Sequence, residues 1–195
     1  MRITISHTAV IALSAALLST ASLIGFPGAG FAQEKTVTVG GAPMYPSKNI
    51  VENAVNSKDH TTLVAAVKAA GLVDTLSGKG PFTVFAPTDA AFKKLPAGTV
   101  ETLVNPESKK ALTGILTYHV VAGKMDAMAL MKAIKDGGGS ATLKTVAGGN
   151  LTATTSGDKV VITDAKGGKS TVTIADVNQS NGVIHVVDTV LMPAA

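Results

Sequence analysis

The spacing of apolar residues changes once along this chain of 195 residues. Between residues 50 and 135, apolar side chains recur every three or four positions in short runs, which predicts a series of short helices. From Ala141 onward the spacing falls to two, and turns such as Asn181-Gly182 separate the runs, which predicts an antiparallel meander of strands. Helices followed by a meander predict an α+β fold.

One predicted strand comes before this change of period. Phe82 and Val84 point to one face of the strand and Phe85 to the other, because side chains alternate along an extended chain. Since both faces are apolar, the strand is predicted to lie in the interior of the sheet. Pro87 suits its end, because proline has no N–H to donate to a neighbouring strand.

A helix is predicted to follow this strand directly. The hydroxyl of Thr88 can accept a hydrogen bond from a free N–H of the first helical turn, so Thr88 is the expected N-cap. Asp89 then places a negative charge in the positive first turn. Phe92 continues the helix.

The first 32 residues have the layout of a secretory signal peptide. Arg2 precedes the apolar run Ala9–Leu18, and a stretch of small residues ends at Ala32. The run is too short to span a bilayer comfortably, which takes roughly 20 residues. We therefore expect an exported protein, periplasmic or extracellular, with no transmembrane anchor after cleavage.

Residues 33–48 are rich in polar residues, glycine and proline. They are predicted to form a flexible leader before a single domain over residues 49–195. Met44 and Tyr45, at the end of the leader, are apolar enough to pack back onto that domain.

The composition of the chain argues against several kinds of protein. The chain has no cysteine, so disulfides and a lipoprotein anchor are excluded. Its formal net charge is +4, and the single arginine, Arg2, falls in the predicted signal peptide. Because arginine forks are the usual means of bidentate phosphate and base recognition, nucleic-acid binding is not expected.

No catalytic motif stands in the sequence. Neither Gly-x-Ser-x-Gly nor His-Glu-x-x-His occurs, and a cysteine nucleophile is impossible. The segment Gly168-Lys169-Ser170 matches only the end of a phosphate-binding loop, because Thr163 stands where that motif needs its first glycine. We expect a protein that is not an enzyme and requires no cofactor.

The histidines and a row of methionines are the candidate metal ligands of the sequence. His119 and His185 could converge with Asp188, but no ligand spacing such as His-x-x-x-His supports this, so core histidines are the favoured interpretation. Met125, Met128 and Met131 stand three apart and could present thioethers to Cu(I). Such a row is more often an adaptable apolar face, and Ile134 continues its spacing. Copper handling is a distant alternative, and no metal site is predicted.

Three motifs, in order, resemble those of the fasciclin domain, a family of secreted and cell-surface modules. Residues 80–92 resemble its first signature, 116–121 its tyrosine–histidine motif and 181–193 its second signature. The resemblance implies a wedge-shaped β-sandwich of about seven strands flanked by several short helices. Its structural signature residues in this chain are Phe82, Phe85, Pro87, Thr88, Phe92, His185 and Asp188.

The family's general role is adhesion, so the resemblance implies a module that binds an envelope or extracellular-matrix component. In the family, the pair corresponding to Tyr118 and His119 is tied both to domain integrity and to adhesion, and both interpretations stay open here. A segment before the second signature is linked to integrin binding in animal members, and only Asp176 is identical in this chain. Asp176 could equally accept a hydrogen bond in a turn.

Some fasciclin proteins that resemble this one bind carotenoids. The alternative function is therefore a carrier for a lipophilic small molecule such as a carotenoid, which needs an apolar tunnel. The same side chains could equally pack as core. The candidate lining residues are Met44, Tyr45, Pro46, Ile50, Val51, Met128 and Met131.

Overall fold

The computed structural model describes residues 35–194, so the predicted signal peptide lies outside the described residues. The strands are β1 (Val37–Val39), β2 (Ala42–Met44), β3 (Phe82–Pro87), β4 (Val120–Ala122), β5 (Ser140–Lys144), β6 (Asn150–Ser156), β7 (Lys159–Thr163), β8 (Lys169–Gln179) and β9 (Gly182–Val187). The helices are α1 (Ile50–Ala54), α2 (Thr61–Ala70), α3 (Val73–Ser77), α4 (Asp89–Lys93), α5 (Thr99–Val104), the 3-10 helix η1 (Pro106–Ser108), α6 (Lys109–Tyr118) and α7 (Ala127–Asp136).

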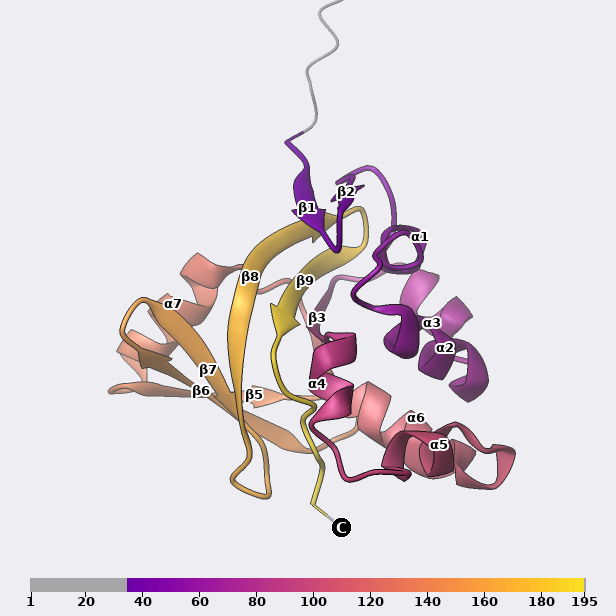
Figure 1. Ribbon diagram of the computed structural model, residues 1–195. Coiled ribbons are helices and arrows are strands. Elements are labelled where there is room, and N and C mark those ends of the chain that lie inside the picture. Colours follow the sequence, from indigo (N-terminus) through magenta and orange to yellow (C-terminus); the bar gives the residue numbers. More distant parts are fainter. Residues whose placement is uncertain (1–34, 195) are drawn as a thin grey trace, which may run out of the picture. The chain divides into compact units, whose positions relative to one another are not determined.

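Seven strands form one sheet in the order β4-β3-β9-β8-β7-β6-β5 (Figure 1). β3 lies between β4 and β9, so the prediction of an interior strand is confirmed. Its pairing with β9 is parallel, whereas the meander from β5 to β9 is antiparallel. The two edges, β4 and β5, approach each other where Val121 and Thr145 form a bridge, so the sheet nearly closes into a barrel.

Strand β8 allows the sheet to fold over on itself. Its N-terminal part pairs with β7 and also with β9, and its C-terminal part pairs with β9 alone. The register shifts twice between Val172 and Val177, and such bulges bend a strand. Asp176 lies in this irregular stretch with a φ of 59°. The result is an α+β fold, as predicted.

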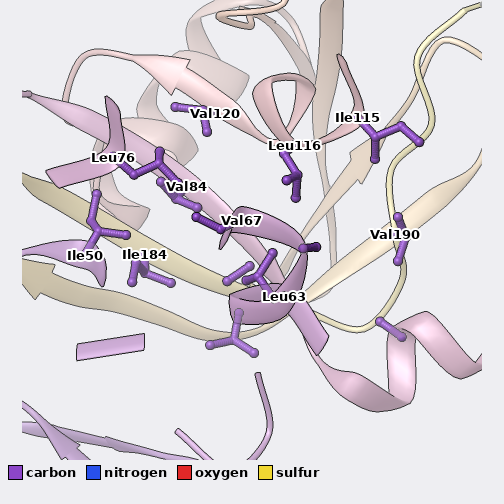
Figure 2. Packing of buried hydrophobic residues seen from close by; sticks show 14 of the residues in the cluster. Ile50, Leu63, Val67, Leu76, Val84, Ile115, Leu116, Val120, Ile184 and Val190 are labelled. Atoms are coloured by element: carbon purple, nitrogen blue, oxygen red, sulfur yellow. The ribbon is translucent and has the colours of Figure 1, made fainter. Parts of the chain in front are cut away.

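Two apolar clusters occupy the two sides of β3. Phe85 is fully buried in the cluster inside the curved sheet, together with Leu151 and Ile162. Val84 points the other way, into the cluster between the sheet and the helices, which we call the helix-side cluster (Figure 2). Burying a large apolar side chain contributes roughly 1.5–3 kcal/mol, so both faces of β3 stabilise the fold.

The structure differs from the prediction of a flexible leader over residues 33–48. β1 and β2 form a hairpin in which Val37 pairs with Met44, and Gly40 and Gly41 turn the chain with φ of 58° and 77°. Two glycines between strands favour such tight turns. Val39 and Met44 are buried in the helix-side cluster, so the ordered domain includes this hairpin.

Candidate functional site

An apolar cavity of about 60 Å³ lies within the helix-side cluster. The hairpin, helices α1 to α3 and α6, and strands β3 and β9 contribute its walls. Figure 2 shows several of these side chains converging from separate elements. The apolar lining includes Val39, Met44, Ile50, Val51, Leu63, Val67, Leu76, Val84, Leu116, Val120 and Ile184.

Only some of the predicted lipophilic-site residues meet at this cavity. Met44, Ile50 and Val51 line it, whereas Tyr45 and Pro46 do not. Tyr45 follows the last residue of β2 and is exposed, and Pro46 lies beyond the strand. The cavity wall therefore includes the candidate residues of β2 and α1, and ligand binding by them stays a prediction.

The methionine row does not form the apolar face that its spacing indicated. On α7 the buried residues are Leu130 and Ile134, while Met128 is 79% exposed and Met131 45% exposed. α7 packs against β5 and β6, away from the cavity, so neither methionine lines it. The spacing of apolar residues could not show which face of α7 is buried, because Leu130 and Ile134 recur with the same helical period as the methionines.

His60 is a buried polar residue of the cavity wall that no sequence pattern marked as a candidate site residue. It lines the cavity, is 3% exposed, and its Nδ1 lies 2.8 Å from the Ser57 hydroxyl. Its Nε2 has no hydrogen-bond partner among the described residues. Burial lowers the pKa of His60, which keeps the ring neutral and leaves one free donor or acceptor inside an apolar space.

Tyr118 and His119 both lie in the interior. The Tyr118 hydroxyl donates to the Asn150 carbonyl at 2.7 Å and accepts from the Ala165 N–H at 3.0 Å. The His119 Nδ1 donates to the Ile115 carbonyl at 2.8 Å, and its Nε2 accepts from the Leu191 N–H at 2.9 Å. Neither side chain is free to meet a partner, so the geometry supports domain integrity as the role of the pair.

Burial sets the charge of His119. It lowers the pKa of the ring to about 4, against a usual value of 6.5. The Ile115 carbonyl and the more distant charge of Asp164 oppose this shift only in part. His119 is therefore neutral at pH 7, which its acceptor nitrogen requires.

Asp176 and His185 hold the start of α7. The Asp176 carboxylate accepts from the Ala127 N–H at 2.6 Å, beside the N-cap Asp126. The His185 Nε2 donates to the Met125 carbonyl at 2.8 Å, and its Nδ1 accepts from the Asp176 N–H at 3.4 Å. Asp176 therefore serves as a second cap for this helix, in line with the turn interpretation of this residue.

Replacing Asp176 with alanine is expected to lower the free energy of unfolding by about 1–3 kcal/mol. The change removes a helix-capping acceptor and puts an alanine at a φ of 59°, a region that favours Asn, Asp and Gly. Urea denaturation measures the loss. Asp158→Ala, at an exposed turn, is the matched control and should change stability by less than about 0.5 kcal/mol. An equal effect of the two changes would contradict the capping role.

The described residues offer no clustered metal ligands. Within residues 35–194, no group of three His, Cys, Asp or Glu side chains is placed to hold a metal ion. Both ring nitrogens of His119 and of His185 are already hydrogen-bonded. Over the same residues, no helix is long and apolar enough to cross a membrane.

Comparison with known proteins identifies the family. A family model described as Fasciclin domain matches residues 58–193. The chain belongs to the fasciclin domain family. Protein sll1483 of Synechocystis sp. is 46% identical over 178 residues, which are 89% of this chain and 92% of that protein. The cell surface glycolipoprotein MPB83 of Mycobacterium bovis is 34% identical over 180 residues, which are 90% of this chain and 74% of that protein.

A solved structure shares the fold. The FAS1 domain pair from the insect cell adhesion molecule Fasciclin I superposes with a TM-score of 0.68 at 22% sequence identity. The match covers 76% of this chain and 52% of that one, so this chain spans about half of the solved pair. At this identity the likeness establishes the fold only.

The signature residues of this fasciclin domain serve its structure. Thr88 accepts from the Ala91 N–H at 3.2 Å, which confirms it as the N-cap of α4. Asp89 instead reaches across to α2, where it accepts from the Thr62 N–H at 2.8 Å. Asp188 accepts from the Thr171 N–H at 2.8 Å and so joins the end of β9 to β8. The two carboxylates thus each tie two elements together, whereas the Thr88 hydroxyl caps a single helix.

Proposed function

We propose that this chain is an exported fasciclin-domain module that acts by adhesion to an envelope or matrix component, without catalysis. The proposal rests on one observation: the buried tyrosine and histidine side chains that could act in catalysis are already hydrogen-bonded within the domain. Tyr118, His119 and His185 are each engaged in hydrogen bonds that join segments far apart in the chain. A module with this interior contributes its exposed loops and helix faces to binding.

Export is part of this proposal. The first 32 residues have the charge, apolar run and small-residue stretch of a signal peptide. A relative that covers 90% of the chain is named a cell surface glycolipoprotein, which supports an envelope location. Mass spectrometry of the protein from its own host should find a mature N-terminus near Gln33. A full-length protein retained in the cytoplasm would contradict export.

Adhesion is tested with the folded domain. Beads coated with residues 33–195 should be retained on immobilised envelope fragments of the producing organism, and free domain should compete them off. Beads coated with the same chain after thermal unfolding are the control, because they carry identical composition without the folded surface. Retention equal to that control would contradict the proposal.

A second candidate function rests on the apolar cavity. We propose that it accepts the end of a lipophilic molecule that carries one polar group, for which the His60 Nε2 provides a partner. At about 60 Å³ the cavity is smaller than the roughly 150 Å³ engineered cavity that holds benzene. A ligand as long as a carotenoid therefore requires the wall of hairpin, α1 and α2 to move outward.

Filling the cavity is expected to abolish uptake of such a ligand. The mature chain is incubated with a mixed carotenoid extract, and visible absorbance co-eluting with the protein on gel filtration is measured. Ala54→Phe places a ring at a lining position and should remove the absorbance, whereas a Met128→Ala, Met131→Ala double variant should retain it. Circular dichroism checks that both variants fold.

Two outcomes would contradict the carrier function. A colourless wild-type peak means that the cavity takes no pigment. Loss of pigment in the methionine double variant alone would place the ligand on α7, outside the cavity. Neither outcome bears on adhesion, which is measured without added lipid.

A further inference from the structure

A second hollow, of about 540 Å³, lies at the opposite end of β3 from its C-terminal Pro87. It is formed where the loop after α3, the β8–β9 turn and the loop after β4 come together. We call it the lysine cleft. Its lining residues are Asn49, Ser77, Gly78, Lys79, Gly80, Pro81, Lys124, Gln179, Ser180, Asn181 and Gly182.

The lysine cleft is positively charged. Lys79 and Lys124 line it from two separate loops, and no aspartate or glutamate is among its lining residues. Both lysines are exposed, and the ion pairs found among residues 35–194 involve only Lys94 and Lys132. At the rim, the Glu52 carboxylate accepts from the Asn49 N–H at 2.9 Å and is engaged in the capping box of α1.

Asn181 fixes the shape of the cleft. Its Oδ1 accepts from the Ile50 N–H at 3.1 Å, and its Nδ2 donates to the carbonyls of Leu76 at 2.7 Å and Gly78 at 2.9 Å. These bonds join the β8–β9 turn to α1 and to the end of α3. The backbones approach so closely that a Cβ at Gly80 would collide with the Asn181 carbonyl. The cleft is therefore formed before any ligand arrives.

The remaining groups indicate what could fill the cleft. Ser77 and Ser180 present exposed hydroxyls, and Pro81 is the one lining residue with a sizeable apolar side chain. Hydroxyls and backbone groups suit sugar hydroxyls, whereas a peptide would need apolar positions for its side chains. The two ammonium groups suit anionic groups spaced along a chain. The volume falls within the roughly 300–1,000 Å³ of ligand sites.

We propose that the lysine cleft binds an anionic polysaccharide, with Lys79 and Lys124 contacting its charged groups. The inference rests on the proposed adhesion function and names the chemistry of the partner. The carboxylates of a uronic acid chain and the sulfates of a sulfated chain share the required chemistry, and the experiment separates them.

The test is calorimetric titration of residues 33–195 at low ionic strength. The ligands are oligogalacturonate, dextran sulfate, neutral dextran and poly-glutamate of matched length. A Lys79→Ala, Lys124→Ala double variant should bind the anionic polysaccharide about five- to tenfold more weakly. The matched control is Lys159→Ala, Lys166→Ala, which removes the same charge from two exposed positions away from the cleft and should change binding less than about twofold.

Each outcome decides the inference. Binding of oligogalacturonate or dextran sulfate that is weakened only by the cleft variant supports it and identifies carboxylate or sulfate as the charged group. If both double variants weaken polysaccharide binding equally, the ligand is attracted to the net charge of the protein and not to the cleft, which would overturn the inference. Equal or tighter binding of neutral dextran or poly-glutamate would also overturn it. Envelope adhesion by wild-type beads without any glycan binding would overturn this inference and leave the proposed function standing.

Discussion

Replacing Phe85 with alanine is expected to lower the free energy of unfolding by about 3–5 kcal/mol. Phe85 is fully buried, and its ring stacks on that of His185 with centroids 5.7 Å apart. Its N–H donates to the His119 carbonyl at 2.9 Å, so the strand around it is fixed and cannot collapse into the space left behind. Urea denaturation of the mature chain measures the change.

Phe82→Ala is the matched control for this change. The same substitution on the same strand removes a half-buried ring at the edge of the helix-side cluster, so the expected loss is about 1–2 kcal/mol. A loss below about 1 kcal/mol at Phe85 would be a surface-scale effect. It would contradict the placement of that ring inside the curved sheet.

Acidification from pH 7 to pH 5 is expected to destabilise the domain by about 2 kcal/mol through His119 alone. The folded pKa of His119 is about 4, below its unfolded value of 6.5, so the neutral ring is the form that the fold stabilises. This contribution is complete above pH 6.5. It is lost as the pH falls toward 4, because the unfolded chain takes up a proton that the folded chain does not.

Burial also lowers the pKa values of His60 and His185, so both add to the loss in the same direction. Urea denaturation at pH 7 and pH 5 measures the total. An NMR titration of the native protein assigns the part due to His119, whose ring signals should stay unchanged down to pH 5. His119→Gln is the control, because its amide keeps one donor and one acceptor but does not titrate. A folded pKa near 6.5 would contradict the prediction.

Local chemistry made β3 and α4 predictable. The alternation of Phe82, Val84 and Phe85 indicated a strand covered on both faces, and Pro87 and Thr88 marked its end and the next helix. The structure confirms these points, because each depends on neighbours within a few residues. The period-two runs after Ala141 likewise became strands β5 to β9.

The candidate sites depended on contacts between distant segments. His60 had no local sign of a role, and it becomes a cavity residue only because β3 and the hairpin are packed around it. The lysine cleft joins Lys79 and Lys124, which are far apart in the sequence, across a turn fixed by Asn181. Met128 and Met131 matched a buried face in spacing, but the sheet covers Leu130 and Ile134 instead.

The sequence by itself determined the helices after residue 50, strand β3, the strands of the meander, the α+β class, the N-cap of α4 and the membership of the fasciclin family, since these rest on local periods, a capping residue and ordered motifs. Only the tertiary structure decided that β3 runs parallel to β9, that residues 37–44 form a packed hairpin, and that Tyr118, His119 and Asp176 face inward. The reason is physical. A side-chain period shows that a face is apolar or polar, but which segment covers that face depends on packing between residues far apart in the chain.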